Sequence, residues 1–169
     1  MVFVSLFACS DVLGLDTGVV EAFTSEVEAW EPGDSDTDPL GSHRPVDDRC
    51  PVASWRPDGG ALEVETGACH YAWLVQEVPA DLVAGSVLSA DVWHSALDAL
   101  EPAEGHVALV LDGELIWEAT RSIPGEPGIL EVDVVLQHDV EAGALLGLHL
   151  HNHGDNAWNL GPVTIRPPP

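Results

Sequence analysis

The chain from Cys50 onward is divided into short apolar or alternating runs, and this division most restricts the folds open to it. The runs are separated by connectors rich in Gly, Pro and Asp, which supply turn chemistry. No long helical pattern interrupts them. The sequence therefore predicts an all-β, antiparallel β-sandwich of the jelly-roll type over residues 50–166. The expected strands are residues 61–65, 70–78, 86–94, 106–111, 114–119, 130–136, 145–152 and 158–165.

Residues 10–49 differ in composition from the rest of the chain. Asp or Glu occupies 11 of these positions, and the stretch from Glu31 to Ser42 has little apolar area to bury. Such a segment is expected to be an acidic, disordered linker. A short docking helix over residues 19–30 is the alternative there, because Phe23, Val27 and Trp30 would share one helical face.

The charge of the chain excludes several classes of partner. The chain has 29 acidic residues, five Arg and no Lys, which gives a formal net charge of -24. Phosphate backbones and anionic lipid headgroups would be repelled, so we expect neither nucleic-acid binding nor electrostatic membrane docking. The absence of Lys also excludes Schiff-base chemistry and Walker-type phosphate loops.

The first residues contain Leu6-Phe7-Ala8-Cys9, followed by Ser and Asp. This motif resembles the lipobox of bacterial lipoproteins. The resemblance implies that residues 1–9 are a truncated signal, that Cys9 is lipidated, and that the protein is exported and lipid-anchored in the cell envelope. The anchor would then be its only contact with the membrane. The alternative is an apolar first strand with a buried free Cys9.

Cys50 and Cys69 bracket the first turn and strand of the predicted domain. In an exported protein they are expected to form a disulfide, which would stabilise the fold by about 3 kcal/mol in the chain-entropy model. In a cytosolic protein they would instead be two reduced core cysteines.

Several segments of the sequence are similar to those of the galactose-binding-like β-sandwiches, which include many carbohydrate-binding modules. These segments are residues 67–79, residues 84–93 and, within the last two predicted strands, residues 145–152 and 159–165. The resemblance implies the same β-sandwich fold and a glycan as one possible kind of ligand. The family often has an Asp in the final strand near a structural calcium, whereas this chain has Gly161-Pro162 there.

Three histidines lie at i, i+2 and i+4 in residues 149–153. In a strand they would share one face, opposite Leu146, Leu148 and Leu150. Imidazole and carboxylate ligands suit Zn or Cu, so the expected divalent metal site consists of His149, His151, His153 and Asp155. Further ligands could come from His70, His94, His106 or His138. The alternative is a polar, solvent-facing strand that binds no metal.

Glycan recognition needs an aromatic platform and planar polar side chains. Trp158 lies within a polar turn, so it is the tryptophan most expected to be exposed, and Asp91 and Trp93 would share a strand face. The candidate ligand-binding residues are Trp158, Asn152, Asn156, Asn159, Asp91 and Trp93.

Catalytic motifs are weak in this chain, because it has no Gly-x-Ser-x-Gly elbow and no assignable carboxylate pair. The sequence therefore favours a surface-tethered, non-enzymatic lipoprotein that binds a small molecule or a glycan, with no cofactor that is certain. A metal-binding protein or metalloenzyme that uses the histidines is one alternative, and a structural envelope protein is another. The oligomeric state does not follow from the sequence.

The expected export can be tested by intact-mass measurement on protein extracted from membranes. An acylated N-terminal Cys9 and no titratable thiol are expected, since Cys50 and Cys69 would be paired. Unmodified protein that begins at Met1 and has three titratable thiols would contradict both expectations.

Overall fold

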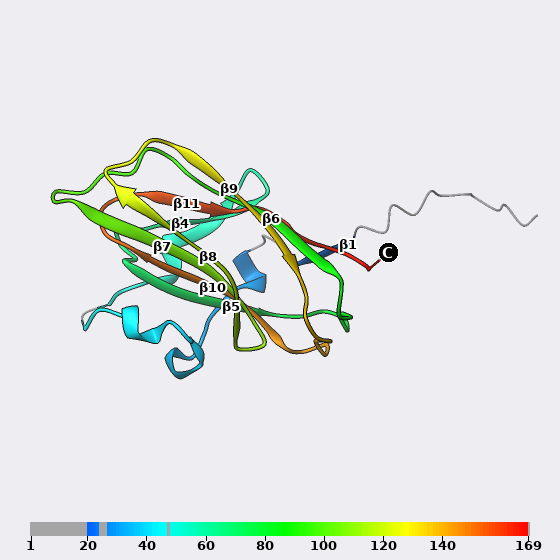
Figure 1. Cartoon of the computed structure of the whole chain (residues 1–169). Helices are drawn as coiled ribbons and strands as arrows, with labels where there is room; N and C mark the ends of the chain where they lie inside the picture. Colours follow the sequence, from blue (N-terminus) through cyan, green and yellow to red (C-terminus); the bar gives the residue numbers. More distant parts are fainter. Residues whose placement is uncertain (1–19, 24–26, 47, 169) are drawn as a thin grey trace, which may run out of the picture.

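Two antiparallel sheets pack face to face in the computed structural model, which describes residues 20–23, 27–46 and 48–168 (Figure 1). One sheet has seven strands and the other has five. Successive strands cross repeatedly from one sheet to the other, as in a jelly roll. The predicted β-sandwich is therefore confirmed.

The seven-stranded sheet is the larger of the two. Its order is β1-β12-β6-β11-β4-β3, and β9 pairs with β6. The strands are β1 (Val20–Phe23), β3 (Trp55–Asp58), β4 (Ala61–Glu65), β6 (Val87–His94), β9 (Gly128–Val135), β11 (Ala157–Leu160) and β12 (Val163–Arg166).

The five-stranded sheet has the order β2-β5-β10-β7-β8. Its members are β2 (Glu31–Pro32), β5 (Tyr71–Glu77), β7 (Ala103–Leu111), β8 (Glu114–Ile123) and β10 (Leu145–Asn152). Short 3-10 turns are η1 (Val27–Ala29), η2 (Ser35–Thr37), η3 (Gly41–His43) and η4 (Val52–Ser54).

Strand β10 shows how the alternation of the sequence builds the core. Leu146, Leu148 and Leu150 point between the sheets and are at most 3% exposed. His149 and His151, on alternate positions, therefore point to the outer face of the five-stranded sheet. The same alternation on β5 and β7 brings Leu74 and Leu109 into the core.

The predicted strand 158–165 is divided in the structure. Gly161 and Pro162 separate β11 from β12, and both strands pair with β6. Proline has no N–H to donate to a ladder, so a break at this position is expected on physical grounds. Strand β3 was not predicted, because Pro57 interrupts its short, mostly exposed sequence.

The predicted acidic linker is wrong for the part of residues 10–49 that the structure describes. Strand β1 pairs with β12, and β2 pairs with β5. Phe23 and Trp30 join the core at 3% and 4% exposure, which provides the apolar anchors that the acidic composition concealed. The alternative of a helix over residues 19–30 is also wrong for the described part, which forms β1 and η1. Cys9 and the proposed lipobox lie outside the described residues.

Cys50 and Cys69 form the predicted disulfide, which joins the segment before η4 to the connection between β4 and β5. No helix in the described ranges has both the length and the apolar character needed to span a membrane.

Trp30 provides a test of whether the acidic segment belongs to the folded unit. Trp30→Ala should lower the free energy of unfolding by about 3–5 kcal/mol, because it removes a large buried side chain. Denaturant unfolding would measure this, with Val46→Ala as the control, since Val46 is fully exposed on the same segment. Equal stability of the two variants would mean that the segment is a linker after all.

Candidate functional site

The outer face of the five-stranded sheet contains two adjacent rows of aromatic and imidazole side chains. Tyr71, His151 and His106 lie opposite one another on β5, β10 and β7. The next row contains Trp73 and His149 on β5 and β10. These rows arise because every second residue of each strand points outward.

A segment that we call the strap, residues 31–45, crosses this outer face beside β5 (Figure 1). The Gly33 N–H donates to the carbonyl of Trp73 at 2.9 Å, and the Trp73 indole N–H donates to Thr37 Oγ1 at 3.2 Å. The Trp73 ring lies directly against Gly33 and Gly147, where any larger side chain would collide with it. Two glycines, one on the strap and one on β10, thus create the slot that this ring fills.

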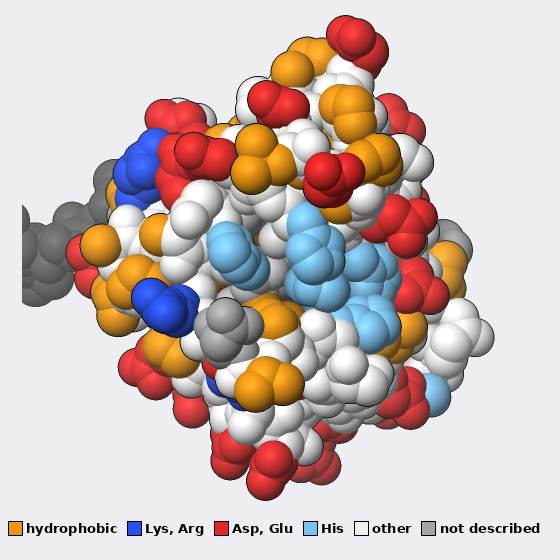
Figure 2. Space-filling model, turned by 90° about the vertical axis from the view of Figure 1, so that its left-hand side faces the viewer, with side chains coloured by type: hydrophobic (Ala, Val, Ile, Leu, Met, Phe, Trp, Pro, Cys, Tyr) orange, Lys and Arg blue, Asp and Glu red, His pale blue; other side chains and the backbone are white. Residues whose placement is uncertain are grey.

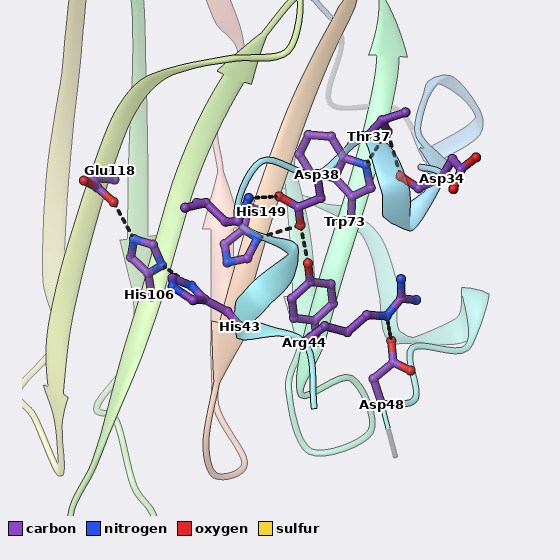
Figure 3. Close-up of polar contacts among 12 residues, drawn as sticks. Asp34, Thr37, Asp38, His43, Arg44, Asp48, Trp73, His106, Glu118 and His149 are labelled. Atoms are coloured by element: carbon purple, nitrogen blue, oxygen red, sulfur yellow. Dashed lines mark hydrogen bonds and ion pairs between the residues drawn. The ribbon is translucent and has the colours of Figure 1, made fainter. Parts of the chain in front are cut away.

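Asp38 joins the strap to the sheet through a buried carboxylate, 7% exposed (Figure 3). It accepts hydrogen bonds from the Leu40 N–H at 2.8 Å, from His149 Nδ1 at 2.9 Å and from the Tyr71 hydroxyl. Burial alone would raise the pKa of Asp38, but the hydrogen bonds from His149 and Tyr71 outweigh it and lower the pKa. Burial and the bond to Asp38 raise the pKa of Tyr71, which stays a neutral donor.

His149 is fully buried, and its two ring nitrogens are in different situations. Nδ1 lies 2.9 Å from the Asp38 carboxylate, whereas Nε2 has no hydrogen-bond partner among the residues that the structure describes. A buried polar atom without a partner costs about 1–3 kcal/mol. The ring edge opposite Asp38 points towards His43 and His106 (Figure 3).

His106 and His43 complete a cluster with His149. His106 Nε2 lies 2.9 Å from Glu118 Oε2, and His106 Nδ1 lies 3.2 Å from His43 Nδ1. One nitrogen from each of the three histidines lies within 4.8 Å of the other two. His43 comes from η3 on the strap, so the cluster unites a segment near residue 40 with two central strands.

His151 and His153 extend the cluster towards solvent, with their ring centroids 4.8 Å apart. Burial, reinforced by the neighbouring histidines, lowers the pKa of His151 to about 4. His151 is therefore neutral at physiological pH.

An open hollow of about 950 Å³ lies over these histidines. In the space-filling view the histidines gather at the centre of this face with acidic side chains around them (Figure 2). The lining residues lie on the strap, on the loop before β7, on β7 and β8, and at or just after the end of β10: His43, Ala99, Leu100, Glu101, Pro102, Ala103, Glu104, His106, Glu118, Thr120, His151, His153 and Gly154.

The structure brings together only part of the metal set expected from the sequence. His149 and His151 share the outer face as expected, and His153 follows the end of β10. Asp155 instead lies exposed against Gly67 and is not part of the histidine cluster. The turn at Gly154, with a φ of 102°, directs the chain away from the strand before Asp155.

Trp158 is not the exposed platform expected from the sequence. It is 2% exposed, and its indole N–H donates to Asn152 Oδ1 at 3.0 Å. Asn152 in turn donates to the Thr66 hydroxyl, and Asn156 Oδ1 accepts from the Asp98 N–H at 2.6 Å. These buried amides hold the turn between β10 and β11, so we reject a direct ligand contact for Trp158, Asn152 and Asn156. Asn159 is also buried, at 6% exposure.

Asp91 and Trp93 share a face of β6 as expected, but β6 belongs to the seven-stranded sheet and not to the sheet that carries the hollow. They line a shallow groove of about 530 Å³ with Ser89, Glu131 and Asp133. Trp93 is partly exposed and Asp91 is exposed. Asn159 on β11 lies directly opposite Trp93 on β6, so these two expected residues share one sheet face, whereas Trp158 points into the core between the sheets.

Sequence reasoning missed Asp38, His43 and Glu118, and it named His106 only as one of four spare histidines. The pairing of β7 with β10 places His106 directly opposite His151, which no spacing along the chain could reveal. Asp38 and His43 lie in the segment interpreted as a linker. The sequence does contain a local signal for turns in this segment, because Asp favours turns in which its side chain accepts the N–H two residues further on. Asp34 and Asp38 both do so in the structure.

Comparison with known proteins gives fold-level likeness only. No family model and no curated protein matches the chain. Among solved structures, the K1 cleaved adhesin domain of Lys-gingipain from Porphyromonas gingivalis W83 is 14% identical, with 89% of this chain and 99% of that chain covered and a TM-score of 0.48.

Two further similar structures are carbohydrate-binding modules by name. One, reported as "CBM4 structure and function", is 11% identical over 67% of this chain and 74% of that chain, with a TM-score of 0.44. A mutant of a carbohydrate binding module family 29 is 9% identical over 68% and 76%, with a TM-score of 0.42. Similarity at this level assigns no ligand to this chain.

The Asp38 carboxylate makes a testable contribution to stability. Tyr71→Phe should lower the free energy of unfolding at pH 7 by about 1–3 kcal/mol, because it deprives a buried carboxylate of a donor. The folded pKa of Asp38 lies below its unfolded value of 3.8, so ionisation of Asp38 stabilises the fold above about pH 4 and this contribution is lost as the pH falls further.

The difference between wild type and Tyr71→Phe should therefore shrink between pH 7 and pH 3. Denaturant unfolding across this range measures it, with the exposed Ser95→Ala as the control. A difference that does not change with pH would show that packing of the ring, and not the charged hydrogen bond, stabilises the fold at this site.

Proposed function

We propose that this protein is a non-enzymatic binding module and that the histidine-lined hollow is its ligand-binding surface. The observation that carries the proposal is the open hollow of about 950 Å³ directly on a sheet face, lined by half-buried and exposed polar side chains. Its rigid floor consists of β7, β8 and β10, which are fixed in long antiparallel ladders. A preformed floor lowers the ordering cost of binding.

The lining favours an uncharged, hydroxyl-rich ligand, with a neutral glycan as the class that fits best. Imidazoles, carboxylates and the Thr120 hydroxyl can donate to or accept from sugar hydroxyls. Leu100 and Pro102 supply an apolar lip for the C–H faces of a sugar ring. Anionic glycans would be repelled by the net charge of -24 and by Glu101 and Glu104 on the rim.

Export and a lipid anchor at Cys9 remain part of this proposal. The Cys50–Cys69 disulfide supports export, because disulfides persist mainly in oxidising compartments. An open binding surface on a tethered domain suits the capture of an extended ligand from outside the cell.

The hollow can be tested with two variants and a matched control. Leu100→Ser and Thr120→Val should each weaken binding of a neutral glycan roughly five- to thirty-fold, as expected for about 1–2 kcal/mol of lost contact or hydrogen bonding. Leu115→Ser, at an exposed Leu near the other end of β8, should not change binding. A screen of neutral and anionic glycans followed by calorimetry provides the measurement.

Two results would contradict the proposal. One is the absence of binding to any neutral glycan. The other is loss of binding in Trp93→Ala while both hollow variants bind normally, which would place the ligand in the groove on the seven-stranded sheet.

A further inference from the structure

The imidazoles of His43, His106 and His149 form a nearly equilateral triangle. Their ring centroids are 5.0, 5.5 and 5.4 Å apart, and the rings are tilted by 60° to 69° against one another instead of being stacked. Rings whose nitrogens bind a single tetrahedral Zn²⁺ at about 2.0–2.1 Å have centroids about 5 Å apart. The arrangement therefore already has the dimensions of a three-histidine metal site.

Two of the three rings have their tautomers set by carboxylates. Asp38 accepts from His149 Nδ1, and Glu118 accepts from His106 Nε2. In each neutral ring the proton then lies on the nitrogen that faces the carboxylate, and the lone pair lies on the other nitrogen. His149 Nε2 and His106 Nδ1 are thereby left as acceptors, in the same carboxylate–histidine pattern that supports metal ligands in proteins.

The unpartnered nitrogen of His149 is an independent observation that points to a ligand. This side chain is fully buried, and within the described part of the chain Nε2 has no hydrogen-bond partner, although Asp38 holds the opposite nitrogen. A nitrogen with a lone pair, turned towards two other imidazoles, is suited to coordinate a cation.

We infer that His43, His106 and His149 bind one divalent transition-metal ion at the floor of the hollow. The His43 and His106 nitrogens are 3.2 Å apart, close to the separation of about 3.3 Å between ligands on a tetrahedral zinc. All three ligand nitrogens lie within 4.8 Å of one another, so small side-chain movements would bring them to the separation that a tetrahedral ion needs. Water or a group in the hollow completes the coordination.

Imidazole ligands select Zn²⁺, Cu²⁺ or Ni²⁺ over Ca²⁺ and Mg²⁺, which prefer oxygen. This distinction matters because the many surface carboxylates of the chain attract any divalent cation weakly. The site goes beyond the proposed glycan-binding function and does not depend on it.

The test is titration of the chelator-treated full chain with Zn²⁺ in the presence of millimolar Ca²⁺, which saturates weak carboxylate sites. Calorimetry should show one tight site per chain, and Co²⁺ should give the absorption spectrum of a tetrahedral complex. His43→Ala and His106→Ala should each weaken Zn²⁺ binding at least 100-fold. Glu118→Gln, which changes only a positioning residue, should weaken it about ten- to 100-fold.

His138→Ala is the matched control, because His138 also contacts a carboxylate, Glu114, at 2.6 Å but lies outside the cluster. It should bind Zn²⁺ like the wild type. His43 lies on the strap near the surface, so its variant remains informative even if His149→Ala fails to fold.

Three outcomes would overturn the inference: no Zn²⁺ binding above the Ca²⁺ background, equal loss in His138→Ala and His106→Ala, or loss in His153→Ala with His43→Ala unaffected. The last would assign the metal to the strand-end histidines instead. Glycan binding measured with and without a chelator separates this result from the proposed function.

Discussion

The buried Asp38 carboxylate is the interaction on which the outer face of the five-stranded sheet depends. It is the point where the strap, Tyr71 on β5 and His149 on β10 meet. A carboxylate removed from water is costly unless donors compensate it, and here three donors do so. This contact sets the tautomer of His149 and fixes the middle of the strap, which carries His43, to the sheet.

The sequence predicted the β-sandwich well because the patterns that indicate strands and turns lie within short stretches of the chain. Alternation on β10 placed Leu146, Leu148 and Leu150 in the core, and turn residues marked most strand ends. The site was predicted only in part, since it depends on pairing between distant segments. His149 and His151 are two residues apart, but His106 reaches them only through the β7–β10 register.

Two errors of prediction have clear physical causes. Trp158 follows a turn of polar residues, which suggested that it would be exposed. Asn152, Asn156 and Thr66 are instead buried, where their polar groups form hydrogen bonds with one another and with Trp158. The acidic segment was interpreted as a linker from its average composition. Two residues instead hold the segment in the folded domain. Trp30 is buried in the core, and Asp38 is buried because its carboxylate accepts hydrogen bonds, which an average of hydropathy does not take into account.

The pairing of β2 with β5 also has a consequence for how the protein behaves among other chains. Without β2, the long strand β5 would be an open edge of the five-stranded sheet, with free N–H and C=O groups available to a strand from another molecule. Strand β2 covers part of this edge, opposite Val75 and Leu74, and one of its two residues is Pro32, which has no N–H to offer. The strap that completes the histidine cluster thus also protects the sheet against edge-to-edge association.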